Sequence, residues 1–250
     1  MTVDPQQLCE IGQSHLVAMR YLDAEAALTA AESTAFARQD WDTLARLYMP
    51  LQECRRQRRQ RCGEGTIRLD LLAESEQCQP DPVEIVGRHP HGQLLVAGWA
   101  SIEPAIRLRE LAAQRQLYVE TFLAAVYPLN GGATCVAIVP TTEVALPPAE
   151  VGASVDHLIA LLPPFSVVLA RSELPSGAKP GDTHTFAFTM ALWERLHLPF
   201  LAAADQTRDL KQRVHACRRA IEVDYACELA HQRLSDTARE LVRAPAPTGL

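Results

Sequence analysis

The spacing of apolar residues changes twice along this 250-residue chain, and that change constrains the fold more than any other feature. Over the first third, apolar residues recur as on one face of an amphipathic helix. From Val83 they fall instead into short runs bounded by turn residues, a pattern typical of strands. From residue 204 the helical spacing returns. The sequence therefore predicts an α+β protein, with helices at both ends and a sheet between them.

Three helices are expected in the first part of the chain, over residues 6–20, residues 23–39 and from Trp41 to Gly63 or Gly65. Asp23 is suited to cap the second helix, because its carboxylate can accept a hydrogen bond from an unpaired backbone N–H. Pro50 removes one donor, so the third helix either kinks there or restarts after it. The links between these helices are short, which makes neighbouring helices antiparallel. The sequence therefore predicts stacked helical hairpins.

Small and large residues follow a regular spacing in this helical part. The first hairpin places them at Gly12, Ala24, Leu28 and Ala31, and the next begins with Trp41, Leu44, Ala45 and Tyr48. This spacing resembles that of a tetratricopeptide (TPR) repeat, with Ala45 where the family has glycine. The resemblance covers about residues 6–62. The sequence departs from the family pattern in two places, since the second unit has no later alanine and the first has no closing proline. The resemblance implies helical hairpins that bind a protein partner. An ordinary helical bundle would give much the same pattern.

The middle of the chain is expected to form a mixed sheet. Strands are predicted over residues 83–86, 94–99, 118–126, 135–139 and 166–170, and helices over residues 102–116 and 185–196. Residues 128–132 separate two of the strands, and Gly131 and Gly132 suit a hairpin because glycine adopts positive φ freely. At least part of the sheet should therefore be antiparallel.

Changes of composition divide the chain into five parts. They are a TPR-like helical part (1–63), a polar linker (64–82), an α+β domain with a mixed sheet (83–203), C-terminal helices (204–243) and a proline-rich, frayed tail (244–250). The apolar stripe shifts phase near Asp224, which predicts either two helices in the C-terminal part or one helix that changes its buried partner.

Charge, cysteine content and hydropathy exclude several classes of protein. The formal net charge of −6 argues against a nucleic-acid binder, and no apolar run approaches the roughly 18 residues of a membrane helix. Seven scattered cysteines fit a reducing compartment better than a disulfide framework. The first residues lack the basic and apolar regions of a secretory signal. We therefore expect a cytoplasmic protein with no membrane partner and no cofactor.

The loop over residues 174–185 carries the candidate ligand-binding residues, which are Ser176, Lys179, Asp182 and His184. It joins a predicted strand to a predicted helix, where many sites of α/β proteins lie, and the N–H groups of a glycine-containing loop can hold an anion. The spacing of its glycines and lysine excludes a Walker phosphate loop. The alternative is a solvent-exposed connection in which Asp182 or Thr183 caps the helix.

His89 and His91 are the candidate metal ligands. In a strand the two imidazoles would lie on one face, and Asp182 with His184 could complete a set of four ligands. Nothing in the sequence brings the two segments together, and the proline and glycine beside the histidines indicate a turn. We therefore favour an exposed turn over a metal site.

Five arginines lie between Cys54 and Cys62, a density that could serve phosphate binding. No aromatic residue adjoins them, and cations are favoured near a helix C-terminus, so we favour a solvated helix face.

The two cysteines are too far apart for CxxC chemistry, and the chain contains no G-x-S-x-G, G-x-G-x-x-G or H-E-x-x-H motif. The absence of these motifs from the sequence does not decide whether the protein is an enzyme.

The function that we favour from the sequence is binding of a protein partner by the helical part, with the α+β domain as scaffold or second recognition surface. The partner would meet the helices near Arg20, Arg38 and Arg46. The alternative is an enzyme or a binder of a small anion or metal, with its site in the loop 174–185. A third alternative is a structural subunit of a homo-oligomer.

Overall fold

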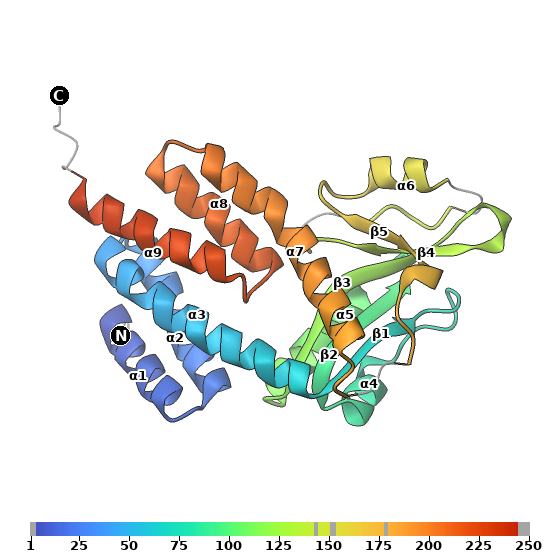
Figure 1. Cartoon of the computed structure of the whole chain (residues 1–250), viewed down its shortest axis with the longest axis horizontal. Helices are drawn as coiled ribbons and strands as arrows, with labels where there is room; N and C mark the ends of the chain where they lie inside the picture. The colour runs from blue at the N-terminus through green and yellow to red at the C-terminus, as the bar shows by residue number, and fades with distance from the viewer. Residues whose placement is uncertain (1–3, 143–144, 151–153, 178–179, 245–250) are drawn as a thin grey trace. The chain divides into compact units, whose positions relative to one another are not determined.

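The computed structural model describes residues 4–142, 145–150, 154–177 and 180–244 (Figure 1). The chain forms two compact units, and each is described here by itself. One unit consists of the segments 1–58 and 197–250, and the other of residues 59–196. Helices α3 (Trp41–Glu64) and α7 (Thr183–Gln206) contribute to both units, because the unit boundaries fall inside them.

The helical unit joins the two ends of the chain in one core. Besides parts of α3 and α7, it contains α1 (Pro5–Val17), α2 (Tyr21–Ala37), α8 (Leu210–Val223) and α9 (Glu228–Arg243). Fully buried apolar side chains of α2, α3, α8 and α9 pack together in this core, among them Leu28, Leu47, Cys217 and Leu234. A hydrogen bond of 2.8 Å from the Ser235 hydroxyl to the Ala45 carbonyl joins α9 to α3.

Helices α1 and α2 form the first predicted hairpin. A Cβ atom at Gly12 would lie 2.5 Å from Cγ of Leu28, so only glycine permits so close an approach. Helix α2 begins at Tyr21, two positions earlier than expected, so the prediction that Asp23 caps it is wrong. Asp23 lies in the first turn instead, where its carboxylate pairs with Arg20 at 2.8 Å.

Helix α3 continues through Pro50 as one helix of 24 residues. Leu47, Leu51 and Cys54 are fully buried, so the apolar stripe runs on past the proline and keeps the helix in the core. A second TPR unit would turn back within this stretch, and α3 does not. The hairpin of α1 and α2 has the close helix packing that the TPR resemblance implies, and the resemblance itself stays a prediction.

The α+β unit is built on a mixed sheet, as the sequence predicts, and its strand order is β1-β2-β3-β4-β5. The strands are β1 (Thr66–Leu72), β2 (His91–Trp99), β3 (Tyr118–Pro128), β4 (Thr134–Ile138) and β5 (Val167–Ala170). The first three run parallel to one another, and β4 and β5 are antiparallel to their neighbours. The predicted hairpin joins β3 to β4, with φ of 76° at Gly131 and 80° at Gly132.

Two local predictions are wrong. The expected linker contains strand β1, in which Ile67 and Leu69 are buried because they pair alongside β2. The expected strand 83–86 belongs to helix α4 (Pro82–Arg88). Asp81 caps this helix by accepting the Val83 N–H at 2.8 Å, and a proline occupies the first helical position. These two helix-start signals outweigh the preference of the β-branched residues for a strand.

Helices cover both faces of the sheet. Helices α4, α5 (Glu103–Gln114) and α6 (Val155–Leu161) pack against one face, whose side chains include Val119, Leu123 and Ala125 of β3. Side chains alternate along a strand, so Phe122 points to the other face, where its ring stacks on Trp193 of α7 with 4.1 Å between the centroids. Helix α6 was not predicted from the sequence.

The phase shift near Asp224 marks a boundary between two helices, α8 and α9. Helix α7 is longer than the predicted 185–196 and continues through Pro199. In the described segments of the chain, no helix is both long and apolar enough to cross a membrane.

Candidate binding pocket beside helix α6

Asp182 of the predicted ligand loop caps helix α7. Its carboxylate accepts hydrogen bonds from the Thr185 hydroxyl at 2.7 Å and from the backbone N–H groups of His184 and Thr185. The hydrogen bond from the Thr185 side chain, followed by those from the backbone, lowers the pKa of Asp182. Ser176 precedes Gly177, whose N–H binds Asp70 at 3.1 Å, and Lys179 lies outside the described residues. The capping role of Asp182 is therefore confirmed, and the loop as a ligand site stays a prediction.

The two candidate metal ligands lie at the ends of different elements. His89 follows the last turn of α4, and His91 begins β2 with its ring against the Arg61 carbonyl. Burial lowers the pKa of His89, helped by the positive charges of Arg68 and Arg88. Across the ranges that the structure describes, no three or more His, Cys, Asp or Glu side chains are arranged to hold a metal ion. The structure therefore does not bring His89 and His91 together with Asp182 and His184 as a ligand set.

The three arginines predicted to meet a partner lie at the two ends of α2 and within α3. Arg20 and Arg38 flank the two ends of α2, about 27 Å apart at a rise of about 1.5 Å per residue. Arg46 pairs with Asp42 at 2.7 Å within α3. Arg20 and Arg38 are therefore too far apart to form one small cluster, and their role in binding a partner stays a prediction.

Part of the arginine-rich stretch of α3 is buried, so the prediction of a solvated face is wrong there. Arg55 and Arg58 both pair with the carboxylate of Glu25, at 3.2 and 2.7 Å. Arg59 pairs with the buried Glu120 of β3 at 3.3 Å. These ion pairs join the arginine side chains of α3 to Glu25 of α2 and to Glu120 of β3, which is why this part of the helix is buried.

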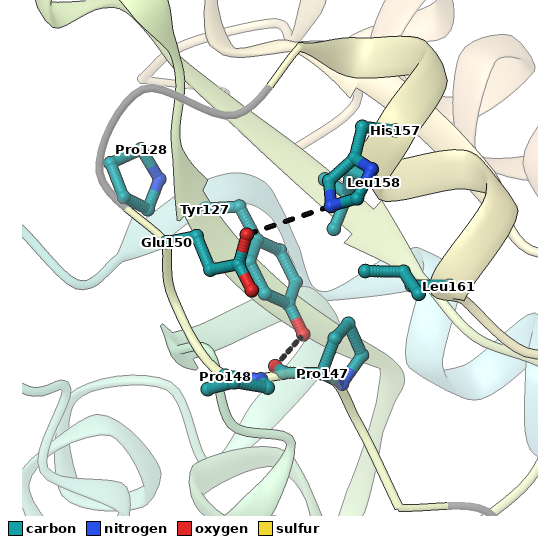
Figure 2. Close-up of a pocket in the computed structure, with 8 residues that line it drawn as sticks. All are labelled: Tyr127, Pro128, Pro147, Pro148, Glu150, His157, Leu158 and Leu161. Atoms are coloured by element: carbon teal, nitrogen blue, oxygen red, sulfur yellow. Dashed lines mark hydrogen bonds and ion pairs between the residues drawn. The ribbon is translucent and has the colours of Figure 1, made fainter.

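A pocket lies between the end of strand β3 and helix α6 (Figure 2). Its lining comes from three segments and consists of Tyr127, Pro128, Pro147, Pro148, Glu150, His157, Leu158 and Leu161. It is a small hollow, with a cavity volume of about 10 Å³, which is room for about one water molecule. In open α/β sheets, ligands bind outside the carboxyl ends of the strands, which is where this pocket lies.

Tyr127 positions the pocket. Its side chain points to the same face of the sheet as Leu123 and Ala125, toward α6. The Tyr127 hydroxyl donates a hydrogen bond of 3.0 Å to the Pro147 carbonyl, which ties the segment 145–150 to the strand. Burial, with a smaller contribution from Cys135, raises the pKa of Tyr127 to about 12, so the phenol stays protonated at neutral pH. Tyr127 therefore has a structural role in the pocket and does not act there as an acid or a base.

Glu150 and His157 face each other at the rim of the pocket, as Figure 2 shows. His157 Nε2 lies 3.5 Å from Glu150 Oε2, and the side chains are 54% and 58% exposed. The Ser154 hydroxyl accepts the backbone N–H of His157 at 3.2 Å and so fixes the first turn of α6. The remaining lining is apolar, so the pocket combines apolar walls with one carboxylate and one imidazole.

Helix α6 is apolar on its outer side as well as on its buried side. Leu158 and Leu162 pack against the sheet. The exposed large apolar residues are Val155 (39%), Ile159 (52%) and Leu161 (48%) on the helix and Phe165 (54%) in the loop after it. We call these four residues, together with the pocket, the α6 surface. Exposed large apolar side chains that gather on one element can mark an interaction site on a protein.

A second group of side chains with chemical potential lies in the helical unit, and the sequence analysis did not find it. His197 of α7 contacts Asp224 at 2.7 Å and is hydrogen-bonded to the side chain of Cys227, the residue before α9. This set has the composition of a Cys-His-Asp triad. The Cys227 residue is only 3% exposed and belongs to the helical core, so the geometry fits a structural connection between α7 and the turn before α9.

Comparison with known proteins gives no further guide. The chain matches no family model, and no significant match was found among curated proteins or solved structures. The function of the protein is therefore inferred from its own residues.

Proposed function

We propose that the protein is an interaction module that binds a partner protein through the α6 surface. The observation that carries this proposal is the exposure of four large apolar side chains on and directly after one short helix, beside a pocket. Burying a half-exposed side chain of this size contributes about 1 kcal/mol, so the four together supply a substantial part of the free energy of a transient complex.

The exposed residues of α6 are separate from those that hold the helix in place. Leu158 and Leu162 fix α6 on the sheet, whereas Ile159 and Leu161 are about half exposed and add little to folding. Binding and stability can therefore be changed independently. The helical unit serves as scaffold in this proposal, and Arg20, Arg38 and Arg46 remain a predicted second contact.

The first experiment selects peptides from a random library displayed on phage, with the full chain as the target. Affinity for the selected peptides is then measured with the variant Leu161→Asp, which places a charge on the α6 surface. We expect this variant to lose at least about tenfold in affinity, or about 1.4 kcal/mol. The matched control is Val17→Asp, which changes an exposed apolar residue of the helical unit and should bind as the wild type does.

Two results would overturn the proposal. One is a set of peptides that bind Leu161→Asp and the wild type equally well. The other is a dimer of the wild type that Leu161→Asp converts to a monomer in light scattering, because the α6 surface would then serve a second copy of the chain rather than a partner.

A further inference from the structure

We infer that the partner binds as an extended strand along the outer edge of β5. This inference rests on the proposed function, because it names the form in which the partner covers the α6 surface. The observation that carries it is an open strand edge, which follows directly after the four exposed apolar side chains of that surface. A strand added to an open sheet edge is a recurring mode of peptide recognition.

Strand β5 ends the sheet in the described part of the chain, and β4 is its neighbour there (Figure 1). Antiparallel pairing uses the backbone groups of every second residue. The Val139 N–H, directly after β4, binds the Leu123 carbonyl of β3 at 2.8 Å. The alternate residues of β4, Val136 and Ile138, therefore direct their backbone groups to β5.

The outer edge of β5 is centred on Val168. The β4 residues that face β5 pair with Leu169 and Val167, so the N–H and the carbonyl of Val168 point away from the sheet. Within the described segments, neither group has a hydrogen-bond partner. The Ala170 N–H follows the same alternation, because it turns to the Glu173 carboxylate at 2.6 Å. Glu173 thus covers one end of the edge, and the backbone groups of Val168 stay open.

This edge lacks the features that keep open strands from pairing with other chains. Natural proteins protect such edges with charged side chains, prolines or bulges. Strand β5 contains only valine, leucine and alanine residues, and its pairing with β4 is regular. An unprotected edge of this kind is suited to bind a strand.

Side chains of an added strand would meet the α6 side of the sheet. Val168 packs against the apolar cluster that contains Leu158 and Leu162 of α6, so it points to that side. A strand about 4.8 Å beyond β5 places every second side chain on the same side. Phe165, 54% exposed, lies two positions before the strand. We therefore expect a partner segment that alternates apolar with polar residues, and the net charge of −6 favours basic residues among the polar ones.

The first test uses the peptides selected from the phage library, each synthesised again with one N-methyl group at successive backbone positions. The methyl group removes one N–H donor and leaves the side chain in place. An added strand directs every second N–H to β5, so methylation at alternate central positions should lower affinity at least about tenfold and have little effect between them. Loss at every central position, as for a helical peptide, or at none would overturn the inference.

Two variants of Val168 locate the effect on the chain. Val168→Pro removes the outward N–H and no hydrogen bond to β4, whereas Val168→Thr keeps the N–H and the branched shape. We expect peptide binding at least about tenfold weaker for Val168→Pro and nearly unchanged for Val168→Thr, with urea unfolding recorded for both. In the wild type, bound peptide should slow amide hydrogen exchange at Val168 at least about tenfold and at Leu169 much less.

Three results from the chain itself would overturn the inference. They are equal peptide binding by the wild type and Val168→Pro, unchanged amide exchange at Val168 in the complex, and a wild-type dimer that Val168→Pro converts to a monomer in light scattering. In the last case the edge would serve a second copy of the chain. After either of the first two results the proposed function stands if peptide binding still depends on Leu161, so the two failures are distinguishable.

Discussion

Nδ1 of His197 lies 2.7 Å from Oδ2 of Asp224, and this buried pair joins helix α7 to the turn between α8 and α9. The other carboxylate oxygen of Asp224 accepts the Ala226 N–H at 3.1 Å, so one oxygen binds within the turn and the other binds α7. The side chain of Cys227 completes the surroundings of the imidazole. A charged pair held in this way makes the stability of the helical unit depend on pH.

Stability should fall as the pH rises from about 6.5 to about 9. Burial alone would lower the pKa of His197, but its hydrogen bonds to Asp224 and Cys227 raise the pKa to about 9. The folded chain therefore still holds a proton on His197 when the unfolded chain has released it near pH 6.5. This proton stabilises the fold by up to about 3 kcal/mol, and the stabilisation is lost as the pH rises through the pKa of His197 in the folded chain. Urea unfolding measured across this range checks the prediction. His197→Gln should flatten the profile, and an unchanged slope in this variant would contradict it.

Gly12→Ala should destabilise the helical unit by about 1–3 kcal/mol, because the added Cβ would overlap Leu28. The measurement is chemical unfolding of the variant and the wild type. Leu28→Ala also destabilises, since it leaves a cavity, but the double variant should cost less than the sum of the two. Strict additivity would show that the two helices do not meet at these residues.

The pair of Glu25 and Arg55 should show a coupling energy well above that of an exposed ion pair. Both side chains are largely buried, Arg55 also contacts the buried ring of His231, and Glu25 holds Arg58 as well. Glu25→Gln should therefore cost about 3–5 kcal/mol, because it leaves buried positive charge without its partner. A double-mutant cycle with Arg55→Met measures the coupling. The matched exposed pair is Asp42 and Arg46, where a coupling of less than about 1 kcal/mol is expected.

Two neighbouring residues of α6 should respond in opposite ways. Leu158→Ala removes a buried side chain and should cost about 2–4 kcal/mol of stability. Ile159→Ser changes an exposed residue and should alter stability by less than about 0.5 kcal/mol. Thermal and urea unfolding of both variants check this, and a large loss for Ile159→Ser would mean that the outer side of α6 is already covered within the chain.

The sequence predicts those elements whose signal is local. The strand ending near Val126, the glycines of the β3–β4 hairpin and the boundary near Asp224 all follow from runs and turn residues that lie next to one another in the chain. Strand β1 was not predicted because its formation depends on parallel pairing with β2, and because its apolar residues lie next to a polar stretch of the sequence. Helix α4 was not predicted because capping by Asp81 outweighs the preference of Val83 and Val86 for strands.

The candidate site could not be predicted, because it exists only after folding. Tyr127, Pro147 and Leu158 belong to separate segments, and no spacing in the sequence relates them. The exposure of Ile159 and Leu161 is also invisible in the sequence, since an apolar run between turn residues normally predicts burial. His197 and Asp224 meet for the same reason, across two helices rather than within one motif.

The most direct test of the central claim is the affinity of library-selected peptides for the wild type, Leu161→Asp and Val17→Asp, measured with stability recorded for each protein. The α6 surface as docking site predicts that Leu161→Asp loses at least about tenfold in affinity while remaining as stable as the wild type, and that Val17→Asp binds normally. Equal affinity of all three proteins would contradict it.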